Sequence, residues 1–353
     1  MFAGGGTGGH VVPSLAVADE MRRRGYESLF IGTQRGMEAT LVPQAGFPIE
    51  WIEIGGLNRV GAAQALKTLW LLPGSVQRSR AILRESRPAA VFSMGGYVAA
   101  PVVLAAILTG VPVVVMEPNA MPGLVSRGLA RFVSRALVAF EETRGYFPKG
   151  RSEVCGLPVR QEFFEVVERP LDSKFTVLLT GGSRGARTLN RIARECWPLL
   201  KQAALEIFWI HQSGTGEFQA MQAAFAESGV EGRVAAFIPD MAHEYAGSDL
   251  IVSRSGAGAV SEIAAAGRPA ILVPFPYAAD DHQRYNAEAF ERAGAARLLN
   301  EFDLTGQTLC DAIVSLANDP ARRLEMGRKA RDLAHAGAAK RAADVLEETA
   351  AAR

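Results

Sequence analysis

The sequence predicts an α/β protein made of two Rossmann-like domains, each a doubly wound parallel sheet, that face each other across a cleft. Short apolar or β-branched runs alternate with helix-length segments, which is typical of parallel sheets covered by helices. Near-continuous apolar runs such as residues 111–116 fit strands that are buried on both faces. The two halves also resemble each other, because each opens with a short strand, a glycine-rich turn and a helix.

The bulk composition indicates a globular chain of two domains. The 353 residues correspond to domains of roughly 100–200 residues, and 48% hydrophobic residues supply two cores. A net charge of +1 gives no general attraction to nucleic acid, and we expect none as a partner. Residues 1–160 carry 17 Lys and Arg against 11 Asp and Glu, whereas the remainder carries 21 against 26. The basic N-terminal half favours an anionic partner such as a lipid surface or a pyrophosphate, although uneven solvated charge explains it equally well.

Cysteine usage indicates a reducing compartment, and hydropathy indicates a protein that can touch a membrane but should not cross it. Cys155, Cys196 and Cys310 are isolated and odd in number, which favours neither a disulfide framework nor a zinc site and fits a reducing compartment. The first ten residues have no basic stretch followed by an apolar one, so they do not form a signal peptide. The longest apolar runs, at 98–108 and 111–116, are interrupted or too short to span a bilayer.

The expected elements alternate along the whole chain. The predicted strands are residues 28–31, 49–54, 90–93, 111–116, 135–138, 176–179, 206–210, 234–237, 250–252, 270–273 and 296–298. Helix-length segments lie between many of these strands, for example residues 13–24, 37–45, 76–85, 186–200 and 259–266, and the last predicted helix is roughly residues 338–351. A first strand confined to residues 1–3 is shorter than a central strand usually is, so either the start is late or the strand is truncated. We expect an N-terminal domain of residues 1–158, onto which the helix at 338–353 packs back, and a C-terminal domain of residues 159–337.

Residues 4–10, GGGTGGH, form a glycine-rich turn ahead of a helix that we expect to begin near Pro13. Glycines let a ligand approach the backbone, and a helix N-terminus attracts anions, so the turn suits a phosphate or pyrophosphate. A tight turn without a ligand is the alternative. No acid follows the next strand where the dinucleotide fingerprint requires one, which disfavours a nicotinamide enzyme. His10 lies at the helix entrance, where the dipole favours neutral imidazole and hence a base; a capping or core-edge histidine fits equally well.

Two segments of the second half suit a nucleotide. Residues 181–186, GGSRGA, form another strand–turn–helix junction, in which Ser183 offers a hydroxyl to a diphosphate. Residues 254–262, RSGAGAVSE, follow a buried strand at the sheet edge where open α/β sheets bind ligands. Glu262 falls about one turn into the helix, where its carboxylate can accept both hydroxyls of a ribose. A purely structural turn and a Glu that only complements the helix dipole are the alternatives.

Polar side chains follow three further predicted strands. Residues 274–287 carry side chains suited to sugar hydroxyls, namely Asp281, His282, Gln283 and Asn286. The Asp280–Asp281 pair lacks a third acid at matching spacing, so no metal is predicted. In the first half, Tyr97, Glu117 and Asn119 are placed to hydrogen-bond an acceptor sugar, although structural loop roles fit their spacing equally well.

Residues 65–73, ALKTLWLLP, combine apolar side chains with a basic cluster of Arg59, Lys67, Arg78 and Arg80. An exposed apolar face beside cations suits an anionic lipid interface. The expected membrane-contact residues are Leu66, Lys67, Leu69 and Trp70. A buried core helix is the alternative.

Taken in chain order, these motifs resemble the MurG family of glycosyltransferases. The resemblance runs from Gly4 to at least Gly294 through GGGTGGH, GTQRGMEATLVPQAGF, SMGGYVAAP, EPNAMPG, GLPVR, GGSRGAR, HQSG, FIPDM and RSGAGAVSEIAAAGRPAILVPFPYAADDHQRYNA. It implies the GT-B fold and an inverting transfer of N-acetylglucosamine from UDP-N-acetylglucosamine. The implied acceptor is the 4-hydroxyl of undecaprenyl-pyrophosphoryl-N-acetylmuramyl-pentapeptide, which is the step from lipid I to lipid II in peptidoglycan synthesis. It also implies a peripheral protein on the cytoplasmic face of the cell membrane.

The resemblance also implies roles for individual residues. The residues that would hold the donor are Ser183, Ile238, Ala257, Gly258, Ala259, Val260, Ser261, Glu262, His282 and Gln283. Within this set, Glu262 would take the ribose and the backbone at Ile238 the uracil. The residues that match further donor- or cleft-binding positions are Thr7, Gly8, Gly9, Asn119 and Arg160. His10 matches the general base, with Tyr97 and Glu117 near the acceptor. His282 stands where some members have Gln, and Met116 where others have His before the Glu.

These residues suggest a mechanism without cofactor or metal. We expect His10, or else Glu117, to remove the proton of the acceptor hydroxyl as it attacks the anomeric carbon. Helix N-termini and Arg160 would stabilise the charge on the leaving UDP. Three other functions fit the same motifs: a transferase for another lipid such as diacylglycerol, a catalytically idle sugar-nucleotide-binding subunit, and a UDP-sugar epimerase.

Overall fold

The computed structural model describes residues 1–55, 62–167, 174–203 and 205–352, without the side chains of residues 62–65 and 67. The chain divides into two compact units. Unit 1 comprises Met1–Pro158 together with His335–Arg353, and unit 2 comprises Val159–Ala334. The chain therefore leaves unit 1 after Pro158 and returns to it at His335, whereas we predicted a return at residue 338.

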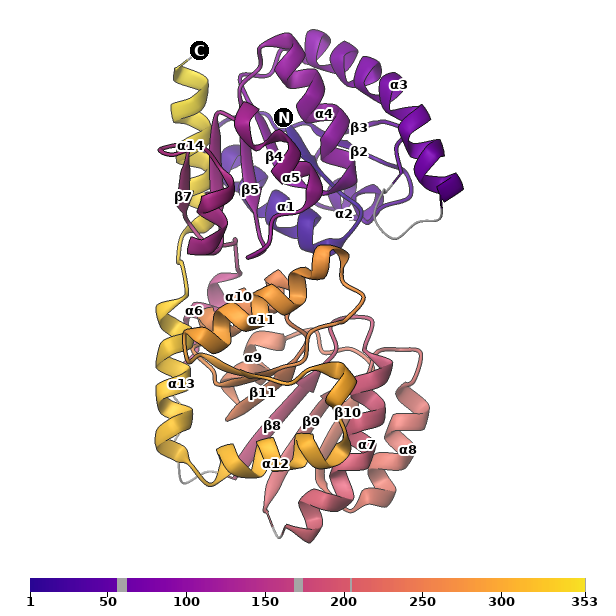
Figure 1. The fold of residues 1–353 in the computed structure, drawn as a ribbon, viewed down its shortest axis with the longest axis vertical. Coiled ribbons are helices and arrows are strands. Elements are labelled where there is room, and N and C mark those ends of the chain that lie inside the picture. Colours follow the sequence, from indigo (N-terminus) through magenta and orange to yellow (C-terminus); the bar gives the residue numbers. More distant parts are fainter. Residues whose placement is uncertain (56–61, 168–173, 204, 353) are drawn as a thin grey trace. The chain divides into compact units, whose positions relative to one another are not determined.

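Unit 1 is built on a parallel sheet of seven strands within its described residues, in the order β3-β2-β1-β4-β5-β6-β7 (Figure 1). The strands are β1 (Phe2–Gly4), β2 (Phe30–Gly32), β3 (Ile49–Trp51), β4 (Val91–Gly95), β5 (Val113–Glu117), β6 (Arg135–Val138) and β7 (Ser152–Val154). The helices are α1 (Gly8–Arg23), α2 (Glu38–Gln44), α3 (Ala62–Ser86), α4 (Gly96–Thr109), α5 (Leu124–Leu129) and α14 (Ala338–Ala351). The chain reverses its direction across the sheet between β1 and β4, and open α/β sheets bind ligands at such a switch point.

Unit 2 repeats this architecture with six parallel strands in its described residues, ordered β10-β9-β8-β11-β12-β13. The strands are β8 (Phe175–Thr180), β9 (Ile207–Gln212), β10 (Glu231–Ala235), β11 (Leu250–Ser253), β12 (Ala270–Leu272) and β13 (Ala296–Leu298). The helices are α6 (Gln161–Phe164), α7 (Arg187–Gln202), α8 (Phe218–Ser228), α9 (Met241–Ala246), α10 (Ala257–Ala266), α11 (His282–Arg292), α12 (Gly306–Ala317) and α13 (Pro320–Asp332). Here the switch point lies between β8 and β11. The prediction of two parallel α/β sheets is thus confirmed.

Apolar packing between sheet and helices holds each unit together. In unit 1 the core includes Val91, Val113 and Val115 of the central strands, packed against α4 residues such as Val98 and Val102. The continuous apolar strands that the sequence shows are therefore buried on both faces, as parallel sheets require. In unit 2 the Trp197 ring meets Trp209 and Phe225 edge to face, with ring centroids 6.3 and 5.0 Å apart.

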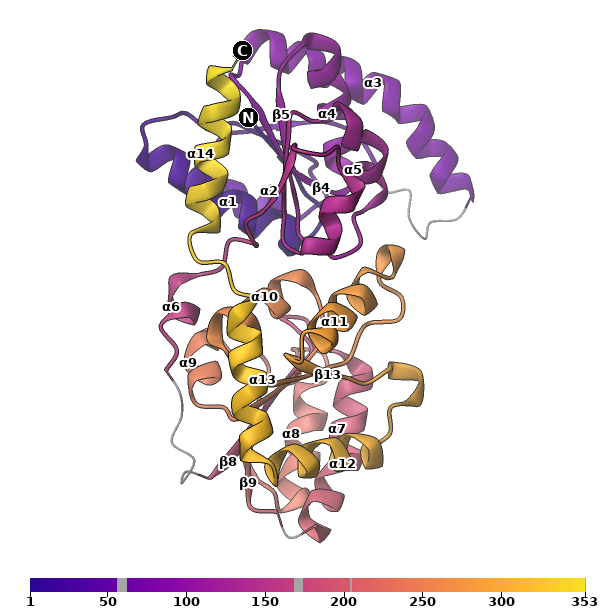
Figure 2. The same cartoon turned by 60° about the vertical axis from the view of Figure 1, so that its left-hand side comes forward.

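The C-terminal helix packs back on the first unit, as Figures 1 and 2 show for α14 beside α1. Arg24, which follows the last residue of α1, makes ion pairs with Asp344 and Glu347 of α14 at 2.8 and 2.9 Å. The Arg24 guanidinium also donates to the carbonyl of Lys340. The Arg24 side chain is only 19% exposed and has several charged partners. Its ion pairs therefore stabilise the packing of α14 more than isolated surface ion pairs would.

Several element boundaries differ from the predictions, and each difference has a local cause. Helix α1 begins at Gly8, five residues before the predicted start near Pro13, with Thr7 in the N-cap position and two glycines in the first turn. Helix α3 runs through Pro73 from Ala62 to Ser86, whereas we predicted residues 76–85. Pro73 is exposed, so water can take the carbonyl whose hydrogen bond it removes. Strand β7 was not predicted, and helix α4 fills the stretch between the predicted strands 90–93 and 111–116.

Candidate functional site

The glycine-rich turn of unit 1 connects β1 to α1 and places His10 in the first turn of the helix. The imidazole Nδ1 of His10 lies 3.1 Å from the hydroxyl of Thr7, which fixes the ring. The ring also packs against Gly96 at the start of α4, where an added Cβ would lie 3.5 Å from it. His10 is half-buried, so its imidazole can reach a ligand at the carboxyl edge of the sheet.

Tyr97 and Glu117 both lie against the backbone of unit 1, Tyr97 through its ring and Glu117 through hydrogen bonds. Tyr97, the second residue of α4, lays its ring against Gly6, where an added Cβ would lie 2.8 Å from the ring. Glu117, the last residue of β5, is only 3% exposed. Its carboxylate accepts hydrogen bonds from the backbone and side-chain nitrogens of Asn119, at 3.2 and 3.3 Å, and from the backbone N–H of Gly123. Glu117 therefore holds its own loop together.

Burial and hydrogen bonding shift the pKa of the Glu117 carboxyl in opposite directions. Removal from water raises the pKa of the Glu117 carboxyl, while hydrogen bonds from Ser126, Asn119 and Gly123 act in the opposite direction. The side chain of Asn119, which we expected near a ligand, is engaged by the same carboxylate.

Unit 2 has a cavity of about 930 Å³ at the carboxyl ends of β8, β9 and β11. The cavity brings together six residues that the sequence predicted as donor-binding, namely Arg160, Ser183, Ile238, Ala259, Glu262 and Gln283. They come from segments spread over more than a hundred residues of sequence and meet at the switch point between β8 and β11.

The glycine turn at one side of this cavity is shaped by close backbone contacts. Gly185 has φ +72°, and a Cβ on it would lie 2.0 Å from the carbonyl oxygen of Ser213. Gly214 faces the turn in the same way, because a Cβ there would lie 2.3 Å from the carbonyl oxygen of Arg184. Glycine is required at both positions, so the turn 181–186 can lie directly on the end of β9.

Glu262 lies in the second turn of α10, since the helix begins at Ala257 rather than at the predicted residue 259. A helix dipole acts mainly within the first turn, so dipole complementation does not account for this carboxylate. Burial raises the pKa of the Glu262 carboxyl to about 7, and the positive charge of Arg160 opposes that shift. The Arg160 guanidinium stacks over the ring of Phe163 at 5.1 Å, which holds it in place at the cap of α6.

The other predicted donor residues lie around the cavity or in the core. Gln283 accepts a hydrogen bond from the backbone of Phe275, and Nδ1 of His282 lies 2.7 Å from the carbonyl oxygen of Ala279. Val260 is fully buried in the core. The helical residues that do not line the cavity are Ala257, Gly258, Val260 and Ser261.

The prediction for Asn286 was wrong. We expected this amide to meet sugar hydroxyls, but it is fully buried and donates to the carbonyl of Ser255 at 3.0 Å. Asp281, expected at the same place, pairs with the guanidinium of Arg284 at 2.5 Å. Asn286 thus ties α11 to the segment before α10, whereas Asp281 pairs within the first turn of α11.

Sequence reasoning missed Gln212, the last residue of β9, because the predicted strand ended at residue 210. The side chain is 2% exposed. Its oxygen accepts from the backbone N–H of Ile238 at 2.7 Å, and its nitrogen donates to the carbonyl of Gly182 at 2.9 Å. Gln212 thus joins the glycine turn to Ile238.

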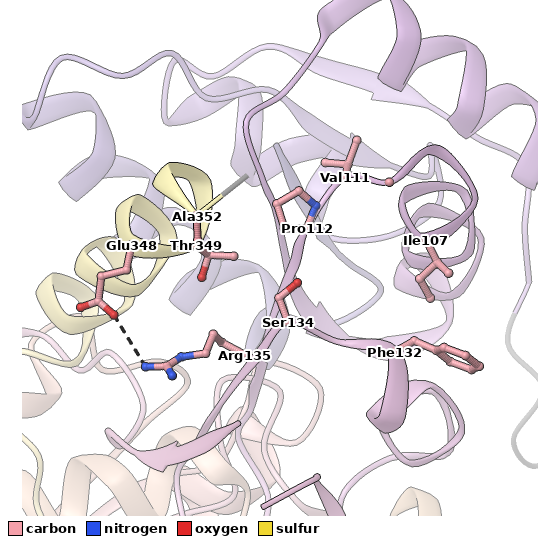
Figure 3. Close-up of a pocket in the computed structure, with 10 residues that line it drawn as sticks. Ile107, Val111, Pro112, Phe132, Ser134, Arg135, Glu348, Thr349 and Ala352 are labelled. Carbon is pink, nitrogen blue, oxygen red and sulfur yellow. Dashed lines mark ion pairs between the residues drawn. The ribbon is translucent and has the colours of Figure 1, made fainter. Parts of the chain in front are cut away.

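A second cavity, of about 550 Å³, lies at the amino ends of β5 and β6 in unit 1 (Figure 3). Figure 3 shows apolar walls from Ile107 and Phe132, and an ion pair at 3.6 Å between Arg135 and Glu348. None of the predicted site residues lines it. Because it lies at the opposite sheet edge from the glycine turns, it is separate from the candidate site.

Within the described residues, no group of three or more His, Cys, Asp or Glu side chains could hold a metal ion. The absence of a metal or other cofactor from the reaction stays a prediction. Across the same residues, no helix is both long and apolar enough to cross a bilayer.

Both halves of the chain match one family. Residues 1–138 match the glycosyltransferase family 28 N-terminal domain, and residues 176–347 match the C-terminal domain of that family. The chain belongs to glycosyltransferase family 28.

Named relatives agree with this family 28 membership. The UDP-N-acetylglucosamine–N-acetylmuramyl-(pentapeptide) pyrophosphoryl-undecaprenol N-acetylglucosamine transferase of Solibacter usitatus is 55% identical, over 99% of this chain and 96% of its own. The relative of the same name from Myxococcus xanthus is 38% identical over 98% and 91% of the two chains.

Solved structures share the fold of this chain. MurG of Acinetobacter baumannii superimposes with a TM-score of 0.83 at 32% identity, covering 99% of this chain and 98% of that one. The calicheamicin glycosyltransferase CalG4 has a TM-score of 0.72 at 18% identity, over 99% and 97% of the two chains, and shows the fold alone. The predicted resemblance to the MurG family and the GT-B fold are thereby confirmed.

The raised pKa of Glu262 predicts a pH-dependent stability. Its carboxyl has a pKa of about 7 in the folded chain against about 4.5 when unfolded, so its stabilising contribution is fully present below pH 4.5 and is lost as pH rises through 7. Glu262→Gln removes this dependence. Denaturant unfolding at pH 5, 6, 7 and 8 should show wild type losing on the order of 2–4 kcal/mol relative to the variant. The exposed Glu227→Gln is the control, and parallel profiles for wild type and Glu262→Gln would contradict the assignment.

Proposed function

We propose that this chain transfers N-acetylglucosamine from UDP-N-acetylglucosamine to the 4-hydroxyl of undecaprenyl-pyrophosphoryl-N-acetylmuramyl-pentapeptide, which converts lipid I into lipid II. The observation that carries the proposal is the 55% identity, over nearly the whole chain, to a transferase named for this reaction. The cavity of unit 2 supports it, because glycine turns and helix starts at a switch point suit a sugar diphosphate.

In this proposal unit 2 holds the donor. Ser183 and the helix starts bind the diphosphate, and Glu262 accepts the ribose hydroxyls. Gln283 and His282 face the sugar, and the backbone at Ile238 meets the uracil. Arg160, whose charge already acts on Glu262, stabilises the negative charge that develops on the leaving UDP. The remaining helix residues Ala257, Gly258, Ala259, Val260 and Ser261 shape the backbone on which the nucleotide lies. No metal or cofactor takes part.

Unit 1 supplies the base in the same proposal. His10 takes the proton of the acceptor hydroxyl, since the Thr7 hydroxyl at 3.1 Å orients its ring. Glu117, the second candidate, has its carboxylate turned onto its own loop, so we assign it to positioning Asn119. Tyr97 lies beside the turn and contacts the acceptor. Thr7, Gly8 and Gly9 contribute the amides of the first helical turn.

We also propose a peripheral attachment of unit 1 to an anionic membrane on the cytoplasmic face, where the lipid acceptor would be found. Leu66, Leu69 and Trp70 of α3 are 69%, 54% and 80% exposed, and their spacing puts them on one helix face. Thr68, between them, is 3% exposed and faces inward. The side chain of Lys67, the fourth predicted contact, lies outside the described residues. Amphipathic helices of this kind insert their apolar face at the headgroup boundary.

The reaction is tested by measuring UDP release from UDP-N-acetylglucosamine with the purified chain. We expect release with a short-chain analogue of lipid I, and none with diacylglycerol or without an acceptor. Release with diacylglycerol alone would indicate a transferase for another lipid. Epimerised donor in the absence of acceptor would indicate an epimerase, and binding of donor without any turnover would indicate an idle subunit; each would refute the proposal.

Replacing the proposed base should lower the rate and leave donor binding intact. His10→Ala removes the imidazole, so kcat should fall by about 10²–10⁴-fold, the usual contribution of a general base. The affinity for UDP, measured by calorimetry, should stay within twofold of wild type because unit 2 holds the nucleotide. The exposed His243→Ala in α9 is the matched control. Normal turnover by His10→Ala would show that another group is the base.

Membrane attachment should depend on the exposed face of α3. Trp70→Ser should weaken sedimentation with anionic vesicles about tenfold, because burial of a large apolar side chain contributes about 1.5–3 kcal/mol. Phe302→Ser is the control, since Phe302 is 78% exposed but lies in unit 2. Equal loss of binding in both variants, or no loss in Trp70→Ser, would exclude α3 as the attachment site.

A further inference from the structure

A buried carboxylate lies directly beneath the glycine turn that leads to His10. Glu38 is the first residue of α2, and its side chain is completely buried. One carboxylate oxygen, Oε2, accepts from the backbone N–H of Gly6 at 2.7 Å. The other, Oε1, accepts from the backbone N–H of Thr33 at 3.0 Å and from the Thr33 hydroxyl at 2.7 Å. The carboxylate therefore joins the turn after β1 to the end of β2.

Three glycines make room for this side chain. An added Cβ would lie 2.5 Å from Oε1 at Gly5, 2.0 Å from Oε2 at Gly36 and 2.6 Å from Cγ at Gly32. None of these three residues has a positive φ, so their backbones would accept alanine. Glycine is needed at these positions because Glu38 fills the space that a methyl group would take.

The turn connects the Glu38 carboxylate to His10 through Gly6 and Thr7. Gly6, whose N–H Glu38 holds, has φ +88° and immediately precedes Thr7. Thr7 occupies the N-cap position of α1, and its hydroxyl lies 3.1 Å from the Nδ1 of His10. Gly6 also contacts the ring of Tyr97, which lies across the turn. Glu38 is thus connected to both of these side chains through one glycine.

We propose that Glu38 is a positioning residue for glycosyl transfer, which fixes Gly6 and Thr7 so that the His10 imidazole is held ready to accept the proton of the acceptor hydroxyl. The proposal rests on the proposed function, in which His10 is the base. It adds a residue that touches neither substrate and acts through the turn.

The site requires a carboxylate rather than an amide. Both oxygens of Glu38 face backbone N–H donors, one from Gly6 and one from Thr33. The nitrogen of a glutamine could accept from neither, so Glu38→Gln leaves one buried N–H without an acceptor in either orientation. Hydrogen bonds to a charged acceptor are also the stronger kind, which keeps the turn in one conformation.

The same carboxylate limits how the turn can bind anions. The N–H of Gly6 is already taken, and a fixed negative charge behind it opposes a phosphate at that point. Any phosphate on this turn must therefore use the amides at the start of α1, from Gly8 and Gly9 onward. The sequence suggested a cradle formed by the whole turn, and the structure restricts it to the helix start.

Two independent variants test the proposal. Glu38→Gln removes an acceptor, and Gly36→Ala pushes the intact carboxylate away from Gly6. Both should lower kcat with the lipid I analogue by about 10–100-fold, while the KM for the donor and the affinity for UDP stay within twofold of wild type. Gly145→Ala is the matched control, because Gly145 is in unit 1, has no neighbouring atom within 4 Å of an added Cβ and has no positive φ.

A double-mutant cycle shows whether Glu38 acts through His10. In a His10→Ala background, Glu38→Gln should change the residual rate by less than twofold, because the base that it positions is already absent. Independent, multiplying losses would overturn the proposal, as would wild-type kcat in a folded Glu38→Gln. If Glu38→Gln does not fold, Gly36→Ala decides by the same criteria. A normal rate in His10→Ala together with a slow Glu38→Gln would refute the proposed base and, with it, the route through His10.

Discussion

The glycine turn of each unit depends on buried polar side chains, which satisfy backbone N–H and C=O groups that have no partner in the sheet. A glycine turn at the end of a parallel strand has N–H and C=O groups without ladder partners, and leaving them unsatisfied inside the protein would be costly. In unit 1 Glu38 accepts from Gly6, and in unit 2 Gln212 bridges Gly182 and Ile238. The turns can therefore be both glycine-rich and fixed.

Glu38 and Gln212 differ in charge, and this difference fits the roles that we propose for the two units. Glu38 places a negative charge behind the turn of unit 1, where the proposed ligand is an acceptor hydroxyl. Gln212 is neutral and lies behind the turn of unit 2, where the proposed ligand is a diphosphate. A carboxylate in place of Gln212 would repel that diphosphate. Arg160, Arg184, Arg187 and Arg254 bring positive charge to the cavity of unit 2, and the charge of Arg160 also opposes the rise in the pKa of Glu262.

The sequence predicted the framework well, because the framework depends on local patterns. The strands that alternate with helices, the helix at 338–351 and the glycine turns all follow from composition and spacing. The start of α1 was missed because two glycines have low helix propensity, and only the tertiary structure holds them in a helical turn. Helix α3 was shortened at Pro73 for the same kind of reason.

The candidate site was predicted only in part. Ser183, Glu262 and Gln283 follow strands in the usual way, and they line one cavity. Gln212 and Glu38 were missed because their partners lie 26 and 32 residues away in sequence, and no local pattern marks a buried polar side chain that will meet them. Asn286 was misassigned for the converse reason, since its polar side chain turns inward to the backbone of Ser255.

The central claim is that a buried side chain keeps a glycine turn ready for its ligand. The most direct measurement is a calorimetric titration of UDP into the wild-type chain and into Gln212→Leu, which keeps the bulk of the side chain and removes its hydrogen bonds to Thr180, Gly182 and Ile238. The account predicts a folded variant that binds UDP about tenfold or more weakly, because one Gly182 carbonyl and one Ile238 amide lose their partner. A folded Gln212→Leu that binds UDP as tightly as wild type would contradict it.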